Sequence, residues 1–512
     1  MTEIFDCSAD GFAPHDLKCE YLVIGSGCGG GTAARVLAEA GKDVILLEEG
    51  GDFLGPARLT QRDTPMYDQL YVDRGGRTNK DRTINILSGR VLGGGGVINA
   101  SDVVPIHDST WEFWQKHHGW KDFSPTAMAP YKAKALLDLS ANRIEEKQIN
   151  RNNQILRQGV EKLGWRGEVM LHNRLNCQGL GSCLIGCPAG AKQNPRMVSI
   201  NKALAAGARV FVRARALQIR DATTDKKRVE VQTLDAKGYH PTNRFAIDAR
   251  TVIVAANPVG TVALLRNSHL GNRQLGQRVS LQPQVPCVAL MPDRVNAFDG
   301  IPQAYALTEF ERHDAEVGLT GFRVESIFGT PGVLGSLVSA PGAQGKALMA
   351  QLDHIAAALV LVPDQPVGEI KVNSGRPEVD YTLTAEWKTR ARQAVRSAAR
   401  AYFAAGAKMV VVPAAPPVLI HSEAELAKID ALTFDPVTIS LISAHQQGGA
   451  RLGPDESTSA CDLNGQVWGT RGVFVCDGSV FPSTSSSHTM TPIITMAHAL
   501  TDRLLQRVGQ PN

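Results

Sequence analysis

Residues 21–30 read YLVIGSGCGG, and after 13 further residues the segment VILLE occupies positions 44–48. An apolar segment, a glycine-rich turn, a helix-length run and a second apolar segment ending in a carboxylate predict a strand–turn–helix–strand unit. Such a unit is the first part of a Rossmann-type parallel sheet. This stretch therefore predicts an α/β fold, and the rest of the chain is interpreted from it.

Three glycines of the turn, Gly25, Gly27 and Gly30, form the pattern G-x-G-x-x-G. The first permits the tight turn, the second lets the backbone approach a pyrophosphate, and the third lets helix and strand pack closely. The helix N-terminus then offers unpaired N–H groups and a positive dipole end to the phosphates. Glu48, 18 residues beyond Gly30, can accept hydrogen bonds from a ribose, and its charge disfavours a 2′-phosphate. We therefore predict a site for FAD or NAD rather than NADP.

Composition limits the classes of protein to which the chain can belong. The 512 residues are 43% apolar, which suffices for two large domains or more, and the net charge of +4 is too small to indicate nucleic-acid binding. No apolar run approaches the roughly 18 residues of a membrane-spanning helix, and the N-terminus lacks a secretory signal pattern. We expect a cytoplasmic protein without a transmembrane segment, whose nine cysteines are free thiols or ligands rather than a disulfide framework.

The order of apolar segments predicts a domain assembled from separate parts of the chain. A buried strand is predicted over residues 251–256, a strand and turn over residues 472–478, and a final helix over about 492–508. Because these elements share the character of the N-terminal unit, we expect both chain ends to fold into one Rossmann-type domain. Its predicted parts are residues 1–110, 171–279 and 455–512.

The remaining segments predict a second domain. Residues 111–170 have a helical pattern, short alternating apolar runs recur from about 280 to 384, and a long helix is expected over 385–406. These features indicate a mainly antiparallel sheet flanked by helices. We assign residues 111–170 and 280–454 to this domain and expect it to bind the substrate.

A second glycine-rich segment, GRVLGGGGVIN, occupies residues 89–99. Four consecutive glycines in an apolar setting indicate backbone pressed against something flat or charged. A flexible linker is the alternative, but linkers do not carry Val-Leu before the glycines and Val-Ile after them. We interpret this segment as a second loop that contacts the cofactor.

Two of the 13 histidines stand out by their context. His445 follows an apolar run and precedes Gly448, and His488 lies in a serine-rich segment just before the last predicted helix. A single histidine is more often a core or surface residue than a catalytic one. An imidazole can nevertheless take a proton from an alcohol near neutral pH, which makes the carbinol hydrogen hydridic and transferable to a flavin N5. We therefore predict that His445 and His488 are catalytic.

These motifs together resemble the glucose–methanol–choline (GMC) oxidoreductases, which are FAD-dependent alcohol oxidases and dehydrogenases. The resemblance extends over nearly the whole chain and rests on residues 25–48, 89–99, 255–261 and 445–492. It implies a Rossmann-type FAD-binding domain, with His445 as the principal catalytic histidine and His488 as its partner. It also implies that the loop Gly93–Asn99 lies along the pyrophosphate and flavin ring, and that Asp477 binds the phosphate–ribityl region.

The cofactor-binding residues predicted from the motifs and the resemblance are Gly25, Gly27, Gly30, Glu48, Arg90, Gly93, Gly94, Gly95, Gly96, Val97, Ile98, Asn99, Ala256, Asp477 and Gly478. Some family members attach FAD covalently through a histidine just before the loop asparagine. Ile98 stands there in this chain, so we expect non-covalent FAD.

The chain departs from the family pattern at two places. The first histidine motif usually continues with Gly-Thr, where this chain has Gly448-Gly449, and the strand end usually reads Ala-Ala-Gly, where this chain has Asn257-Pro258 after the alanines. Neither change removes a proton-transfer group. Both put the loop geometry in question rather than the chemistry.

Cys177, Cys183 and Cys187 have the spacing C-x5-C-x3-C-P within a glycine-rich segment. Zinc normally takes four ligands in two pairs, and no second pair follows. Three thiolates on such a loop suit a 3Fe-4S cluster, and the spacing is similar to that of the cluster-binding bacterial FAD glucose dehydrogenases of this family. Long-chain alcohol oxidase relatives carry a similar loop, in which a cluster cannot be assumed. Reduced structural thiols, or one disulfide and a thiol, are the alternative, and the sequence leaves both open.

The sequence thus predicts an FAD-dependent oxidoreductase that oxidises a small-molecule alcohol to a carbonyl. An acceptor such as oxygen, a quinone or a redox protein then takes the electrons. The alternative is a flavin-containing lyase or decarboxylase, because the same fold hosts both and fold does not settle chemistry.

Overall fold

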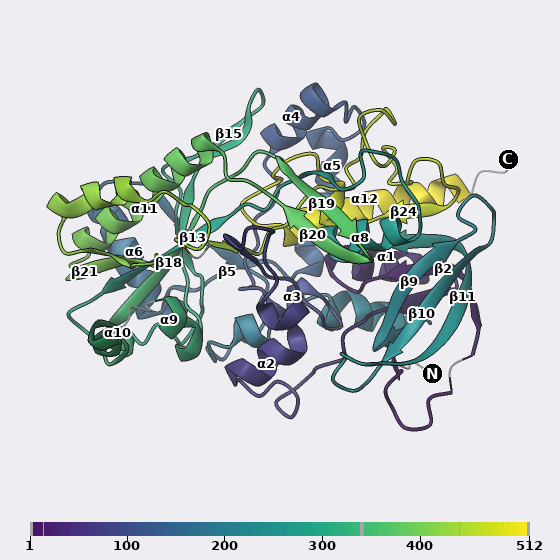
Figure 1. Cartoon of the computed structure of the whole chain (residues 1–512), viewed down its shortest axis with the longest axis horizontal. Helices are drawn as coiled ribbons and strands as arrows, with labels where there is room; N and C mark the ends of the chain where they lie inside the picture. Colours follow the sequence, from purple (N-terminus) through teal and green to yellow (C-terminus); the bar gives the residue numbers. More distant parts are fainter. Residues whose placement is uncertain (1–3, 14, 338–341, 440, 509–512) are drawn as a thin grey trace.

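A mixed sheet built around the glycine-rich N-terminal unit forms one half of the molecule (Figure 1). The computed structural model describes residues 4–13, 15–337, 342–439 and 441–508. The strands of this sheet lie in the order β1 (Ile4–Asp6), β8 (Arg209–Val212), β3 (Val44–Leu47), β2 (Leu17–Ile24), β11 (Pro241–Val254), β10 (Lys227–Leu234) and β9 (Ala214–Arg220), and β24 (Val473–Val475) pairs with β11.

The parallel part of this sheet unites the two ends of the chain. β2 pairs with β3 and β11 in parallel, and β24 joins β11 in parallel near the C-terminus. All four residues of β3 and the last four of β2 are buried, which is typical of parallel strands covered on both faces. The predicted α/β fold, with a Rossmann-type sheet formed by discontinuous segments, is confirmed.

A second, mostly antiparallel sheet forms the other half (Figure 1). Its order is β22 (Val418–Ile420), β21 (Met409–Val412), β13 (Gln284–Leu290), β18 (Ile355–Leu361), β17 (Arg323–Ser326), β14 (Tyr305–Leu307) and β6 (Gly167–Val169), with β23 (Leu441–Ser443) bridging β13 and β4 (Ile84–Ile86). Strand β4 thus reaches this sheet from the N-terminal part of the sequence. The domain boundaries drawn from the sequence stay a prediction.

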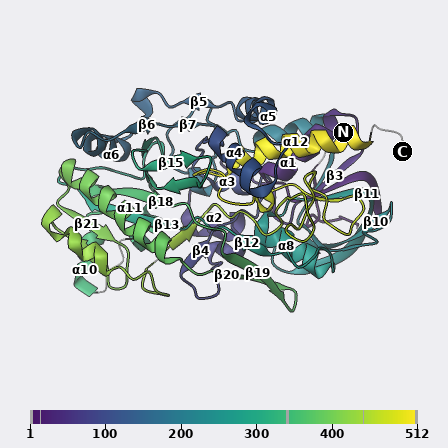
Figure 2. The same ribbon diagram turned by 90° about the horizontal axis from the view of Figure 1, so that it is seen from above.

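Helices cover both sheets. Helices α1 and α12 pack together beside the first sheet, while α6 and α11 pack together on the second, as Figure 2 shows from above. The α-helices are α1 (Cys28–Glu39), α2 (Asp63–Leu70), α3 (Gly95–Ile98), α4 (Asp108–His118), α5 (Pro125–Asp138), α6 (Arg151–Lys162), α7 (Asn201–Ala205), α8 (Asn257–Asn267), α9 (Pro331–Leu337), α10 (Gly342–Met349), α11 (Ala385–Ala404) and α12 (Met490–Val508).

Three smaller sheets complete the fold: β12 (Gln277–Val279), β19 (Gly368–Asn373) and β20 (Arg376–Asp380); β15 (Glu311–Asp314) and β16 (Gly318–Gly321); and β5 (Asn142–Arg143) and β7 (Leu171–His172). Residues 111–170 are therefore not entirely helical as expected, because β5 and β6 fall within them. Among the described residues, no helix combines the length and the apolarity needed to cross a membrane.

Candidate active site

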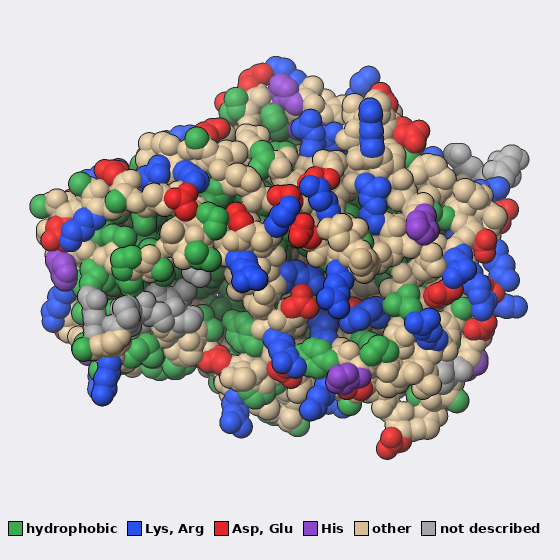
Figure 3. All heavy atoms as spheres, in the orientation of Figure 1, with side chains coloured by type: hydrophobic (Ala, Val, Ile, Leu, Met, Phe, Trp, Pro, Cys, Tyr) green, Lys and Arg blue, Asp and Glu red, His purple; other side chains and the backbone are tan. Residues whose placement is uncertain are grey.

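A cavity of about 1090 Å³ lies between the two sheets. Its walls include residues at the carboxyl ends of β2, β3, β11 and β24, where ligands of Rossmann-type sheets bind, and residues of β13 and β18 from the second sheet. The surface in Figure 3 is hollowed between the two halves of the molecule. The cavity therefore has one wall of the dinucleotide-binding type and a second wall formed by β13 and β18 of the antiparallel sheet.

The glycine turn has the geometry that a bound dinucleotide requires. Gly25 has a φ of +98°, and a Cβ there would lie 2.3 Å from the Ala255 carbonyl oxygen. A Cβ on Gly30 would lie 1.9 Å from the Gly25 carbonyl oxygen, which matches its role in packing helix against strand. Gly27 and Gly95 differ, because a Cβ on either would meet no atom closer than 4.0 Å. Both line the cavity, so the open space beside them is a cradle for a ligand.

Glu48 lies at the end of β3 and lines the same cavity. Its Oε2 accepts a hydrogen bond of 2.5 Å from the Ser26 hydroxyl, and its Oε1 accepts one of 2.8 Å from the Gly50 N–H. Burial raises the pKa of Glu48 to about 7, against the opposing effect of these hydrogen bonds. A buried carboxylate facing a cavity needs further donors, which the hydroxyls of a ribose would supply.

The second glycine loop is joined to the first. The Gly93 N–H donates a hydrogen bond of 2.9 Å to the Ser26 hydroxyl. On its other side, Lys192 donates to the carbonyl oxygens of Val97 and Asn99, both at 2.7 Å, and burial lowers the pKa of this lysine to about 8. One buried cation therefore holds the end of α3 and the residue that follows it.

Most of the predicted cofactor residues face the cavity, as do both histidines. Those that line it are Gly25, Gly27, Glu48, Arg90, Gly94, Gly95, Gly96, Ile98, Asn99, Ala256, Asp477 and Gly478. The Asp477 carboxylate accepts hydrogen bonds from Thr261 and Ser479, so its position is fixed. Gly30, Gly93 and Val97 lie outside the lining and act in packing: Gly93, for example, sits so close to Val97 that a Cβ would lie 2.8 Å from its side chain.

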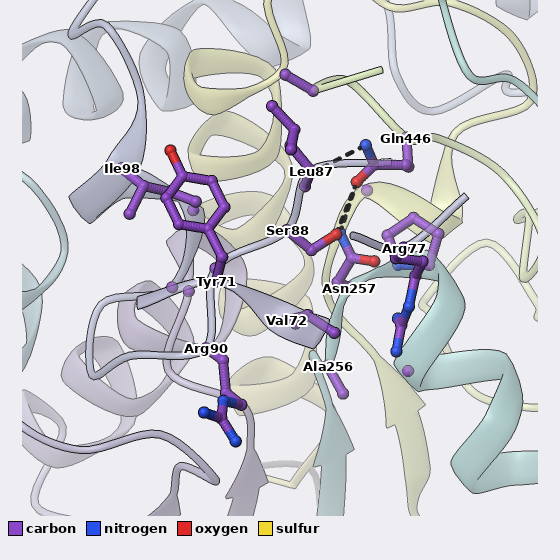
Figure 4. Close-up of a pocket in the computed structure, with 18 of the residues that line it drawn as sticks. Tyr71, Val72, Arg77, Leu87, Ser88, Arg90, Ile98, Ala256, Asn257 and Gln446 are labelled. Carbon is purple, nitrogen blue, oxygen red and sulfur yellow. Dashed lines mark hydrogen bonds between the residues drawn. The ribbon is translucent and has the colours of Figure 1, made fainter. Parts of the chain in front are cut away.

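The structure explains the departure from the family pattern at Asn257. Asn257 has a φ of +68°, a left-handed conformation that glycine adopts readily and that asparagine tolerates better than most residues. Its side chain donates a hydrogen bond of 3.1 Å to Oε1 of Gln446, and Ser88 donates to the same oxygen at 3.2 Å (Figure 4). Asn257 therefore keeps the glycine-like backbone and also fixes the residue next to His445.

The other departure involves Gly448 and Gly449, which both have positive φ, of +80° and +95°. A Cβ on Gly448 would lie 2.2 Å from the Arg278 carbonyl oxygen, whereas one on Gly449 would lie 3.1 Å from its nearest neighbour, a methyl group of Val262. The segment after His445 thus runs tightly against the chain near β12. Neither departure displaces an imidazole from the cavity.

His445 and His488 come from different parts of the sequence, yet their ring centroids lie 4.9 Å apart. His445 follows β23, and its Nδ1 lies 2.7 Å from Oε1 of Gln282 and 3.0 Å from Nε2 of Gln284. Burial, and then the charge of His488, lower the pKa of His445 to about 3. His445 is therefore a neutral imidazole over the physiological pH range.

His488 has the opposite surroundings. It lies just before α12, and its Nε2 is 3.2 Å from Oε2 of Glu325 and 3.8 Å from Oδ2 of Asp102. Burial disfavours the charged form, but the charge of Glu325, the hydrogen bond to it and the charge of Asp102 together outweigh burial, and the pKa of His488 is raised. The surroundings of His488 therefore favour its cationic form, in contrast to those of His445.

Glu325 lies on β17 and is fully buried. It accepts a hydrogen bond of 2.5 Å from Arg323 and one of 3.0 Å from Gln303. Although burial opposes ionisation, His488 and Arg323 lower the pKa of Glu325 to about 2. The pKa of Asp102, in contrast, is raised by burial to about 7. One of the two carboxyl groups near His488 is thus firmly ionised and the other is not.

Sequence reasoning missed Gln282, Gln284, Asp102 and Glu325. A signal was present for Glu325, because the run Arg323-Val324-Glu325-Ser326 places two charges two residues apart on one face of a predicted buried strand. No local signal marked the two glutamines, since only the tertiary fold brings them to His445.

The three predicted cysteine ligands line a separate cavity of about 20 Å³ with Arg174 and Lys192. All are free thiols, and no group of three or more Cys, His, Asp or Glu side chains in the described ranges is arranged to hold a metal ion. The structure therefore gives the expected 3Fe-4S cluster no support. Lys192 links the segment to the site, because it also donates to the Cys183 carbonyl oxygen at 2.7 Å.

A Rossmann-type sheet, a cavity along its carboxyl edge and two imidazoles that line this cavity define a protein of the dinucleotide-binding class with a candidate site for proton transfer. Family models described as GMC oxidoreductase match residues 67–284 and 364–497. The chain therefore belongs to the GMC oxidoreductase family, and the predicted resemblance is confirmed.

Individual relatives agree with this assignment. An uncharacterized GMC-type oxidoreductase of Mycobacterium tuberculosis is 31% identical over 98% of this chain and 78% of its own length. A long-chain-alcohol oxidase of Arabidopsis thaliana is 27% identical over 97% of this chain and 68% of its own length. Among solved structures, a formate oxidase of Aspergillus oryzae superposes with a TM-score of 0.72 at 16% identity, over 97% of this chain and 99% of that one, which supports the fold alone.

Proposed function

We propose that this protein binds FAD non-covalently and oxidises an apolar alcohol to a carbonyl compound. The observation that carries the proposal is the pair of imidazoles, 4.9 Å apart, on a cavity that begins at a G-x-G-x-x-G turn. Glu48 would hold the ribose, the N-terminus of α1 would face the pyrophosphate, and Asp477 would face the ribityl region. When bound, FAD supplies a flavin N5 that accepts a hydride.

His445 is the general base in this proposal. Its Nδ1 is engaged by Gln282, and its Nε2 makes no hydrogen bond within the described part of the chain. A neutral imidazole with a free Nε2 can take the hydroxyl proton of an alcohol as the carbinol carbon loses its hydride. The alcohol thus loses two hydrogens. Its hydroxyl hydrogen goes to His445 as a proton, its carbinol hydrogen leaves as a hydride, and a carbonyl compound remains.

His488 stabilises the negative charge that develops on the substrate oxygen. Glu325 keeps this imidazole protonated, and the buried setting strengthens its electrostatic effect. The positive charge of His488 also lowers the pKa of His445, so the base and the cation have separate roles. This division is the reason two histidines are needed.

The second wall of the cavity favours an apolar substrate. Leu359 and Leu361 alternate with the core residue Val360 on β18, and both line the cavity with Phe328 and Leu334. These side chains offer contact to a hydrocarbon chain. The similarity to a long-chain-alcohol oxidase supports the same substrate class.

Anaerobic addition of primary alcohols to the purified protein tests the reaction. We expect the flavin absorbance to bleach, because the alcohol reduces the flavin. A flavin that stays oxidised with every alcohol would contradict the proposal and favour a lyase or decarboxylase. Oxygen consumption after bleaching then separates an oxidase from a dehydrogenase that uses another acceptor.

The chain length of the alcohol tests the apolar wall. Each buried methylene contributes about 0.8 kcal/mol, or roughly fourfold in kcat/KM. This gain should continue until the alcohol is longer than the apolar wall. We expect Leu359→Ala to reduce this gain per methylene. Val360→Ala is the matched control, because Val360 is buried on the opposite face of the same strand and should change stability without changing the dependence on chain length.

A further inference from the structure

Gln282 has an unusual backbone conformation for a residue with a large side chain. It lies two residues before β13, with a φ of +46°, in the left-handed region where glycine is the usual residue. It is also completely buried. Strained positions of this kind persist only where the surrounding structure enforces them, and they cluster at functional sites. We therefore expect the contacts of the Gln282 side chain to account for this conformation.

The side chain of Gln282 connects the two segments that carry the histidines. Its Oε1 lies 2.7 Å from Nδ1 of His445, and its Nε2 donates a hydrogen bond of 3.2 Å to the Ser486 carbonyl oxygen, two residues before His488. A carbonyl oxygen can only accept, so the Ser486 contact fixes which end of the amide is the NH2 group. The oxygen must then face His445.

This orientation determines where the proton on His445 lies. Facing an acceptor oxygen, Nδ1 of a neutral imidazole carries the hydrogen, and Nε2 keeps its lone pair. The Gln284 amide nitrogen lies 3.0 Å from the same Nδ1 and favours the opposite tautomer, because an amide N–H needs an acceptor. The two glutamines therefore compete for the proton of His445.

We propose that Gln282 is a positioning residue that holds His445 in the Nδ1–H tautomer and so leaves Nε2 able to accept a proton from the substrate. The inference rests on the proposed role of His445 as the base. It extends that role to a residue outside the cavity lining, which acts only through His445. Gln284, whose amide nitrogen lies 3.0 Å from the same Nδ1, opposes it.

Three variants with one substitution type test this inference. Gln282→Met removes the acceptor with little change in length, so Gln284 should become the dominant partner and shift the proton to Nε2. Gln284→Met removes the competing donor and should keep the Nδ1–H tautomer. Gln232→Met is the remote control, because Gln232 is a buried glutamine on β10 that donates to the Asn243 carbonyl oxygen.

The tautomer is read from 15N NMR spectra of histidine-labelled protein at a pH where His445 is neutral, assigned with His445→Ala. We expect the Nδ1–H form in the wild type, Gln284→Met and Gln232→Met, and the Nε2–H form in Gln282→Met. An Nε2–H signal for His445 in the wild type would overturn the inference, and this outcome does not depend on whether either glutamine variant folds. An unchanged signal in folded Gln282→Met would also overturn it.

Flavin reduction by alcohol is measured on the same samples. Gln282→Met should reduce the flavin about a hundredfold more slowly, because the wrong tautomer removes most of the contribution of a general base. If the tautomer shifts and the rate does not, the positioning of the proton stands and the role of His445 as base fails. If the tautomer stays and His445→Ala is slow, the base role stands and the inference about Gln282 fails.

Discussion

The ring centroids of His445 and His488 lie 4.9 Å apart, yet their surroundings shift the pKa values of the two rings in opposite directions. Two neutral amides face His445, while the Glu325 carboxylate, at 3.2 Å, faces His488. Both rings are buried, so burial alone would make both neutral. The comparison shows that carboxyl groups beside a buried ring can reverse the direction in which burial shifts the pKa of its imidazole.

The largest effect on the rate of flavin reduction is expected from removing His445, the neutral histidine of the pair. His445→Ala should keep its flavin and reduce it with alcohol about a hundredfold to ten-thousandfold more slowly, the usual contribution of a positioned base. Stopped-flow absorbance measures the rate. His498→Ala is the control, because His498 is also buried but pairs with Asp138, at 2.7 Å, outside the cavity lining. Equal rates of flavin reduction in the wild type and His445→Ala would contradict the role of His445 as the base and the contrast drawn between the two rings.

The second-largest effect on the rate is expected from removing the negative charge of Glu325, which lies next to His488. Glu325→Gln should lower the pKa of His488 and slow flavin reduction about tenfold to a hundredfold, with a steeper loss of rate as pH rises. It should also destabilise the fold by about 3–5 kcal/mol, because Arg323 loses a buried partner.

Glu311→Gln is the matched control for this variant. Glu311 also pairs with Arg323, at 3.2 Å, but does not contact His488. It should therefore share part of the loss of stability and leave the pH profile of the rate unchanged. Identical pH profiles for wild type and Glu325→Gln would show that Glu325 does not set the charge of His488.

The two rings should also give opposite pH dependences of stability. Between pH 6.5 and its folded pKa of about 3, His445 binds a proton only in the unfolded chain, so its contribution lowers the free energy of unfolding as pH falls. The folded pKa of His488 is raised, so its contribution is complete below pH 6.5, the ordinary value, and is lost as pH rises from there through the raised folded pKa. One proton gives a slope of at most about 1.4 kcal/mol per pH unit.

Urea unfolding of the wild type, His445→Ala and His488→Ala over about pH 4 to pH 9 measures these slopes. His445→Ala should flatten the acid side and His488→Ala the alkaline side. A pair of variants that flattened the same side would contradict the assignment of charge to the two rings.

The smallest effect is expected for the second carboxyl group near His488. Burial raises the pKa of Asp102 to about 7, and its distance of 3.8 Å from the ring is longer than that of Glu325. Asp102→Asn resembles the protonated acid, so below pH 7 it should change flavin reduction by less than about threefold, equivalent to about 0.65 kcal/mol. A tenfold loss at that pH would mean that both carboxylates hold the charge of His488.

Local sequence was sufficient to predict the part of the site that is formed by the two glycine-rich segments and Glu48. The turn at Gly25, the carboxylate Glu48 and the loop Gly93–Asn99 each follow from contiguous motifs, because the chemistry of a glycine turn depends on neighbours a few residues away. The departures at Asn257 and Gly449 could be noticed in the sequence. Their effect on the site could not, because it depends on φ values and on Gln446 lying beside Asn257 and Val262 beside Gly449.

The amino-acid sequence by itself determined the α/β fold and the family and singled out the two histidines as candidates, since these are carried by short runs with their own periodicity and spacing. Only the tertiary structure decided which histidine is neutral and which is charged. Gln282, just before β13, and Glu325, on β17, each lie 163 residues from the histidine that they contact, as the separations from 282 to 445 and from 325 to 488 give. Burial and charge act through distance in space, and no local pattern records that distance.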